Sequence, residues 1–318
     1  MTTTPVPPQG VSLAQDGEAG DDIVAAPPEG PIKRRSRIAA NRLRSPWASF
    51  AAIIIAFLWT TPTVGLLITS FRPVGEINET GWWNIFIDPS FTLDNYSDAM
   101  FGNQTNLGGF FVNSIVITLP AVIIPISIAL LAAYAFAWIE FKGRSILFVA
   151  VFALQVVPIQ ITLIPLLRKY VDWEINGSFW TVWLSHSMFA LPLAIFLLHN
   201  FMKDIPASLI EAARVDGAGH VKIFFKVLLP LLTPAIASFA IFQFLWVWND
   251  LLVALTFAGG QPDVAPLTVA IAELAGSRGS DWHLLSAGAF ISMIVPVVVF
   301  LSLQRYFVRG LLAGSVKG

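Results

Sequence analysis

Six long apolar stretches constrain this chain more than any other feature of its sequence. Each reaches the roughly 20 residues that an α-helix needs to cross about 30 Å of hydrocarbon at about 1.5 Å per residue. Asp250 is the only Asp, Glu, Lys or Arg within them. The sequence therefore predicts an all-α integral membrane protein with six transmembrane helices. The predicted spans are approximately residues 47–71, 110–139, 145–167, 179–200, 227–257 and 283–304.

The composition agrees with a chain that lies mostly in lipid. Apolar residues make up 56% of the sequence and charged residues 12%, about half of the roughly 25% that soluble domains carry. The 318 residues include no cysteine, which excludes disulfides, thiolate metal sites and cysteine nucleophiles. Prolines inside the stretches, such as Pro158 and Pro192, are tolerated in packed membrane helices. A water-soluble fold of this length would lack the charge to cover its surface.

The N-terminal region differs from the rest of the chain. Residues 1–30 are rich in Pro, Gly and acids and show no apolar periodicity, which is typical of disorder. Residues 33–44 carry six basic residues and no acid. We therefore expect residues 1–45 to form a disordered cytoplasmic tail with a basic juxtamembrane segment, and residues 46–318 to form the transmembrane domain.

Basic residues are distributed unevenly between the segments that join the apolar stretches. With the N-terminus in the cytoplasm, 15 of the 19 Lys and Arg residues fall in cytoplasmic segments. The four exceptions are Arg72, Arg168, Lys169 and Arg278. Because Lys and Arg favour the cytoplasmic side of a membrane protein, both termini are predicted to be cytoplasmic.

The cytoplasmic segment between the fourth and fifth stretches predicts a short helix. Pro206 suits its first turn, and Ser208 and Glu211 have the spacing of a capping box. Gly217 and Gly219 are expected to end the helix. A helix of about ten residues is marginally stable alone, so it must pack against something. Residue types leave two partners open, the lipid headgroups and another protein.

The same segment resembles a motif of a known family. It reads Glu-Ala-Ala at 211–213, Gly at 217 and Leu-Pro at 229–230. This order resembles the EAA loop in the integral-membrane subunits of ABC importers. The family has isoleucine two residues before the Leu-Pro pair, where this chain has Val227, a mild departure.

Three other stretches resemble the carbohydrate-importing branch of that family, in particular the smaller permease of the maltose type. Residues 91–96 and 111–114 are similar to its outer-loop and second-span signatures. Residues 304–318 are similar to its C-terminal tail. The resemblance covers roughly residues 45–318.

The resemblance implies a multi-pass permease subunit of the bacterial inner membrane. It would form half of the path for a neutral sugar, such as an oligosaccharide or an α-glucoside. Its implied partners are a second permease, two copies of an ATP-binding subunit, an extracytoplasmic solute-binding protein and the lipid bilayer, with no nucleic acid. ATP and Mg would be bound on the partner ATPase subunits, so this chain would bind no cofactor and would not be an enzyme.

The resemblance also implies which residues meet the ATPase. In the family, the EAA loop forms a coupling helix that lies in a cleft of the ATP-binding subunit. The residues implied for coupling are Ser208, Glu211, Ala212, Ala213, Asp216 and Gly217. The family's C-terminal tail reaches the interface between the two ATP-binding subunits, although residue types alone predict a frayed terminus. The residues implied for that contact are Gln304, Arg305, Gly310, Gly314 and Lys317.

A polar group near the outer end of the fifth stretch is the candidate for contact with the solute. Trp248, Asn249 and Asp250 offer indole, amide and carboxylate groups, which suit stacking on sugar rings and hydrogen bonds to hydroxyls. An ionisable residue inside a span is costly, which favours a function in the translocation path. Near the membrane interface, an Asp that snorkels or that bonds to a helix is the alternative. No span contains Lys or Arg, which disfavours an anionic substrate.

A secondary transporter and an intramembrane enzyme are the alternative function classes. The transporter would need an ion relay within the membrane and often shows inverted repeats, whereas the spans hold one Asp and no repeat. The enzyme would use Asp250 and histidines, but His186 and His199 are thirteen residues apart and form no H-E-x-x-H motif. The chain also lacks a P-loop, so a partner would have to hydrolyse any ATP.

Overall fold

The computed structural model describes residues 46–102, 105–276 and 281–315, with side chains as far as residue 304. Every regular element in these ranges is a helix, and the described residues form no strand. This confirms the predicted all-α class. The predicted N-terminal tail, residues 1–45, and the tail residue Lys317 lie outside the described residues.

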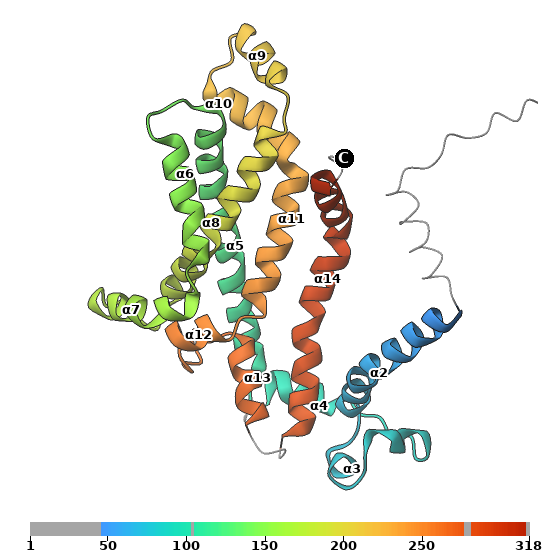
Figure 1. Cartoon of the computed structure of the whole chain (residues 1–318). Coiled ribbons are helices and arrows are strands. Elements are labelled where there is room, and N and C mark those ends of the chain that lie inside the picture. Colours follow the sequence, from blue (N-terminus) through green and yellow to red (C-terminus); the bar gives the residue numbers. More distant parts are fainter. Residues whose placement is uncertain (1–45, 103–104, 277–280, 316–318) are drawn as a thin grey trace, which may run out of the picture. The chain divides into compact units, whose positions relative to one another are not determined.

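Five helices are long and apolar enough to cross a membrane (Figure 1). A sixth span would consist of two shorter helices that meet at an angle of 99°. The five are α2 (Pro46–Ser70), α5 (Leu107–Trp138), α8 (Phe179–Lys203), the continuous helix His220–Trp248, and the first part of α14 (Trp282–Ser315). The described residues therefore contain five such helices, or six spans if the bent pair counts as one.

The third predicted span, residues 145–167, is not one straight helix. It consists of α6 (Arg144–Ala153) with the short 3-10 helix η2 (Leu154–Val156), followed by α7 (Ile159–Asp172). The break falls at Pro158, and Val157 before it is extended, with φ −73° and ψ 117°. Proline lacks an amide donor and disfavours helical backbone in the preceding residue, which accounts for the bend.

The fifth predicted span, residues 227–257, does not coincide with a single helix. The helix begins at His220 with α10 (His220–Ile223), widens into a π-helical turn η3 (Phe224–Leu228), and continues as α11 (Leu229–Trp248). Pro230 cannot donate to the carbonyl four residues earlier, and its ring would clash there; the wider turn relieves that clash. After Trp248 the chain breaks and starts a separate helix, α12 (Leu252–Phe257).

The chain divides into two units, residues 1–60 and 61–318. The described part of the first unit is the beginning of α2. Its large apolar side chains are exposed all round, which is typical of a helix that is surrounded by lipid or by other membrane helices. They are Trp47, Phe50, Ile53, Ile54, Ile55, Phe57, Leu58 and Trp59.

The second unit is built on α5, α8 and α11. The contact between α5 and α8 is the most extensive, and α11 packs against both helices and against α14. Ala129, Ala133 and Ala194 in these interfaces are fully buried. Small residues let membrane helices approach closely, so packing can replace the missing hydrophobic driving force. At Gly288 of α14 a Cβ would lie 2.8 Å from Cδ1 of Leu107, which marks a similarly close approach.

Short helices gather at the end of the second unit opposite α9 (Figure 1). Among them are α4 (Asp94–Phe101) and α13 (Leu267–Ala275), in segments that join the predicted spans. The buried side chain of Arg72 donates to the carbonyls of Glu76 and Thr80, at 3.2 and 3.1 Å. These connecting segments are therefore folded parts of the second unit.

Candidate functional site

The short helix α9 (Ala207–Val215) lies at one end of the bundle, between α8 and α10 (Figure 1). This places the EAA-like segment in a helix, as the sequence predicts. The predicted capping box is wrong. Pro206 is the N-cap with φ −56° and ψ 129°, and no side chain caps this terminus. Ser208 already lies inside the first turn, so its hydroxyl does not occupy the position from which a cap accepts amide hydrogens.

The C-terminus of α9 is a Schellman motif. The amide of Ala218 donates to the carbonyl of Ala213, and the amide of Gly217 donates to that of Arg214, each at 2.9 Å. Gly217 has φ +75°, and a Cβ built there would meet no atom within 4 Å. Glycine is therefore favoured at this position by its positive φ and not by a lack of space. The positive φ produces the chain reversal that the sequence predicts.

The two faces of α9 differ sharply in burial. Ile210 is 2% exposed and, with the partly buried Ala213, packs into the core of the second unit. The other residues implied for coupling are exposed, namely Ser208, Glu211, Ala212, Asp216 and Gly217. Leu209 and Val215 are also exposed, at 45% and 87%. The sequence grouped Ala212 with Ala213, but only Ala212 lies on the free face.

The buried cluster that receives Ile210 includes residues from α5 and from the start of the continuous helix His220–Trp248. Because it belongs to the fifth predicted span, this continuous helix is called the fifth helix below. Tyr134 of α5 belongs to the cluster, and its hydroxyl lies 2.7 Å from Nδ1 of His220. The Tyr134 ring also packs edge-on against His220 and Phe224, with centroid distances of 5.9 and 5.5 Å. No sequence pattern indicated this contact, because its partners are 86 residues apart.

At the opposite end of the fifth helix, Trp248 is buried, and its indole is already engaged in contacts within the chain. Its side chain is 2% exposed, its Nε1 donates to the carbonyl of Ser292 at 3.0 Å, and it stacks on Phe244. Asn249 is exposed, but its amide donates to the carbonyl of Leu245 in its own helix at 2.8 Å. Of these two predicted path residues, only Asn249 is open to solvent.

Asp250 joins several elements at the break after α11. Its carboxylate accepts the amides of Val253 and Ala254 of α12, at 3.3 and 2.9 Å. Its Oδ2 lies 3.6 Å from Nε2 of His186 in α8, and both side chains are more than nine-tenths buried. Its backbone carbonyl accepts the hydroxyl of Thr268 in α13. These contacts fit the alternative of an Asp that bonds to nearby helix amides.

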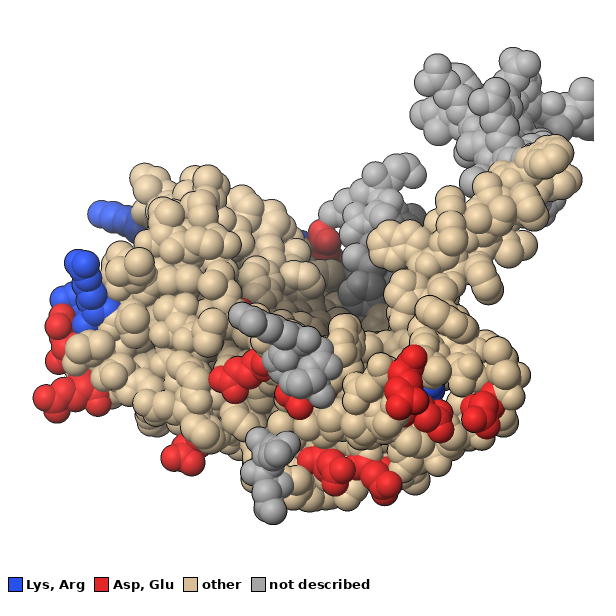
Figure 2. All heavy atoms as spheres, turned by 90° about the horizontal axis from the view of Figure 1, so that it is seen from below, with Lys and Arg blue, Asp and Glu red and all other residues tan. Residues whose placement is uncertain are grey.

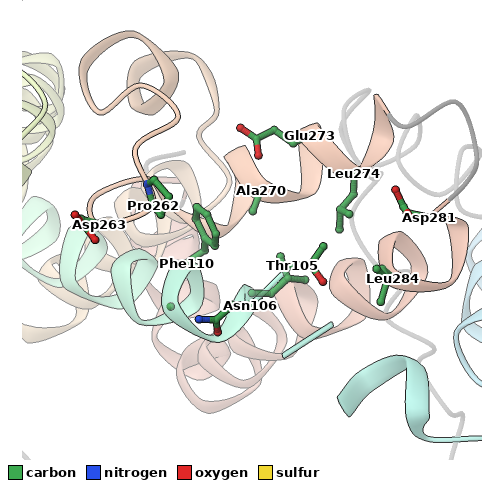
Figure 3. A pocket seen from close by; sticks show the side chains of 12 residues that line it. Thr105, Asn106, Phe110, Pro262, Asp263, Ala270, Glu273, Leu274, Asp281 and Leu284 are labelled. Carbon is green, nitrogen blue, oxygen red and sulfur yellow. The ribbon is translucent and has the colours of Figure 1, made fainter. Parts of the chain in front are cut away.

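A cavity of about 650 Å³ lies between the starts of α5 and α14 and helix α13 (Figure 3). Three carboxylates line it, from Asp263, Glu273 and Asp281, together with the amide of Asn106 and the ring of Phe110. Figure 2 shows Asp and Glu side chains spread over this end of the unit. Sequence reasoning missed the cavity, because its lining residues come from stretches that are far apart in the sequence.

The predicted tail contact falls on the last helix. Gln304 is exposed and donates to the carbonyl of Leu301 at 3.3 Å. Helix α14 continues to Ser315, so the backbone of Arg305, Gly310 and Gly314 is helical beyond the predicted end of the span. Within the described ranges, no group of three or more His, Asp or Glu residues is arranged to hold a metal ion.

A family model described as a binding-protein-dependent transport system inner membrane component matches residues 125–312. The chain belongs to this family. It is 57% identical over 271 residues to the osmoprotective compounds uptake permease protein GgtD of Synechocystis sp., covering 84% of this chain and 90% of the relative. It is 47% identical over 262 residues to the alpha-glucoside transport system permease protein AglG of Rhizobium meliloti, covering 79% and 67%.

Solved structures share the fold. The chain matches a subunit of a bacterial ABC transporter involved in the import of the acidic polysaccharide alginate with a TM-score of 0.70. The match covers 89% of this chain and all of the other at 20% identity. The comparisons confirm the resemblance to carbohydrate-importing ABC permeases and the location as a multi-pass protein of a bacterial inner membrane.

Proposed function

We propose that this chain forms half of the membrane path of an ATP-driven importer for a neutral sugar or glucoside. The single observation that carries the proposal is the free face of α9. It presents Glu211, Ala212 and Val215 away from the bundle in a chain of the binding-protein-dependent transport family. A helix held mainly by one buried side chain, Ile210, is suited to dock into a second protein.

In this proposal, α9 is the coupling helix and lies in a cleft of an ATP-binding subunit. Both termini are cytoplasmic, which places α9 on the side where the basic residues collect. Ala212 allows close approach, and Glu211 pairs with a basic residue of the ATPase. Two such subunits bind ATP and Mg, and their closure pushes on α9. The C-terminal end, from Gln304 to Lys317, contacts the same subunits.

A neutral substrate suits the charges of this chain. The outer cavity is lined by Asp263, Glu273 and Asp281, which would repel an anionic polymer. The structurally similar importer takes an acidic polysaccharide, but at 20% identity that likeness concerns the fold alone. The permease that is 47% identical is named for alpha-glucosides. An α-glucoside is therefore the substrate class we propose.

The assembly would require a second permease and an external solute-binding protein. One structural neighbour, with a TM-score of 0.59, is a bacterial alginate ABC transporter in complex with a periplasmic protein bound to an alginate pentasaccharide. In the assembly proposed for this chain, Asn249 is exposed to the path, and Trp248 and Asp250 hold the backbone around it.

The test is uptake by the whole importer in proteoliposomes. The chain is reconstituted with its partner permease, ATPase and binding protein, and radiolabelled trehalose or maltose is supplied outside with ATP and Mg inside. We expect uptake that requires ATP, the ATPase and the binding protein together. Uptake driven by a proton gradient without ATP would contradict the proposal and favour a secondary transporter.

A further inference from the structure

The attachment of α9 to the rest of the chain raises a mechanical question. Ile210 and Ala213 are its inward-facing contacts, and apolar contact has no preferred direction. Such a contact transmits a push into the bundle but resists a sideways or outward displacement weakly. A directional link is needed nearby if the movement of α9 is to reach a specific helix.

The start of the fifth helix offers such a link. His220 is its first residue, and it follows the Schellman reversal at Gly217 by three residues. Its Nδ1 lies 2.7 Å from the hydroxyl of Tyr134 in α5. Tyr134 is 6% exposed and belongs to the buried cluster that also contains Ile210. A hydrogen bond fixes both distance and direction, which apolar packing does not.

The chain beyond His220 makes this link more consequential. Only the four residues of α10 separate the loop from the π-helical turn at Phe224–Leu228. A π-helical turn is a local departure from the regular α-helical ladder, and such turns occur frequently at functional sites. If α9 displaces His220, the π-helical turn can deform, so that the rest of the fifth helix does not move. The hydrogen bond to Tyr134 instead transmits the displacement of His220 directly to α5.

We propose that the hydrogen bond between Tyr134 and His220 carries the movement of α9 to α5, so that these two are positioning residues for coupling. The inference rests on the proposed function, because it assumes that an ATPase moves α9. Since α5 has its most extensive contact with α8, a displacement of α5 at this end moves the central pair of helices together. Without this hydrogen bond, fewer solute molecules are imported for each ATP that is hydrolysed.

The test compares variants in the proteoliposome assay by the number of solute molecules imported per ATP hydrolysed. Tyr134→Phe keeps the ring contacts with His220 and Phe224 and removes only the hydroxyl. Tyr170→Phe is the matched control, because it removes a buried hydroxyl that lies 3.0 Å from Ser185 Oγ, away from α9. We expect Tyr134→Phe to lower the ratio about three- to tenfold, as the loss of one hydrogen bond permits, while the control stays at the wild-type ratio.

A second pair of variants, at His220, tests the same hydrogen bond from its other side. His220→Leu removes the partner atom and should lower the ratio as Tyr134→Phe does, whereas His220→Asn retains a polar group near Nδ1 and should restore part of it. The double variant Tyr134→Phe/His220→Leu should be no worse than either single one, since both remove the same bond. The amount of purified complex separates loss of assembly from loss of coupling.

Two results would overturn the proposal. One is a wild-type ratio in both Tyr134→Phe and His220→Leu, which would leave the proposed function standing. The other is an equal fall in Tyr134→Phe and Tyr170→Phe, which would indicate a general packing effect. If the wild-type assembly shows no ATP-dependent uptake, the proposed function fails, and the coupling proposal fails with it.

Discussion

The two ends of the fifth helix are held in opposite ways. At the His220 end, the neighbouring α9 is anchored by one fully buried side chain, Ile210, and most of its surface is exposed. At the Trp248 end, the side chain of Asp250 is 8% exposed, and its carboxylate accepts hydrogen bonds from two amides of α12 and lies beside His186. The segment after Trp248 is fastened internally, whereas α9, which precedes the His220 end, leaves most of its groups free for a partner.

This difference predicts that substitutions in the two regions affect different properties, namely the stability of the fold and the coupling of α9 to the ATPase. A group at the fastened end has its partners within the chain, so its loss should weaken the fold itself. A group on α9 has few internal partners, so its loss should affect the attachment of α9 or the response to the ATPase. Three substitutions can break or sharpen this comparison.

The largest effect is expected at the anchor of α9. Ile210→Ala removes the buried side chain and should weaken the attachment of α9 by about 2 to 5 kcal/mol, because the transfer energy is lost and a cavity remains. Hydrogen exchange of the amides of α9 should become faster while α5 and α8 stay protected. Leu209→Ala is the control, since Leu209 is 45% exposed. Equal exchange in both variants would show that Ile210 is not the anchor.

A smaller effect is expected at the fastened end. Asp250→Ala leaves two amides of α12 without their acceptor and should lower the free energy of unfolding by about 1 to 3 kcal/mol. Thermal unfolding in detergent measures this loss. Asp250→Asn retains an acceptor oxygen and should lose less. If Asp250→Ala unfolds at the same temperature as Asn249→Ala, the break after Trp248 is not held by this carboxylate.

The smallest effect is expected at the end of α9. Gly217→Ala forces a Cβ onto a residue with φ +75° and should destabilise the Schellman motif by about 1 kcal/mol. Gly219→Ala is a close control, because Gly219 has φ −75° and equally open surroundings. The exchange rate of the Ala218 amide reports the change. Identical rates in the two variants would mean that the positive φ carries no cost here.

The sequence predicted the spans because lipid leaves few choices for a long apolar segment. It could not predict how each proline would act. Pro120 and Pro125 lie inside the continuous α5, whereas Pro158 separates α6 from α7. Neighbouring helices can satisfy the backbone groups that a proline frees, and a local pattern does not encode where they do so. The same limit explains why the bend in the third span was not predicted.

The candidate site was predicted in part for a similar reason. The reversal at Gly217 follows from local chemistry, and the sequence placed it correctly. The capping box was assigned to Ser208, because the spacing to Glu211 does not reveal that Pro206 and Ala207 already begin the helix. The contacts of Tyr134 with His220 and of His186 with Asp250 join distant segments, and no local pattern encodes them.

The wide turn at Phe224–Leu228 also affects how the apolar pattern of the fifth helix is interpreted. A regular α-helix advances about 100° per residue, so every side chain keeps a fixed phase relative to those before it. A π-helical turn takes more residues to complete the same rotation. The face that α10 presents and the face that α11 presents are therefore out of phase. A single helical wheel through residues 220–248 would mix two separate stripes.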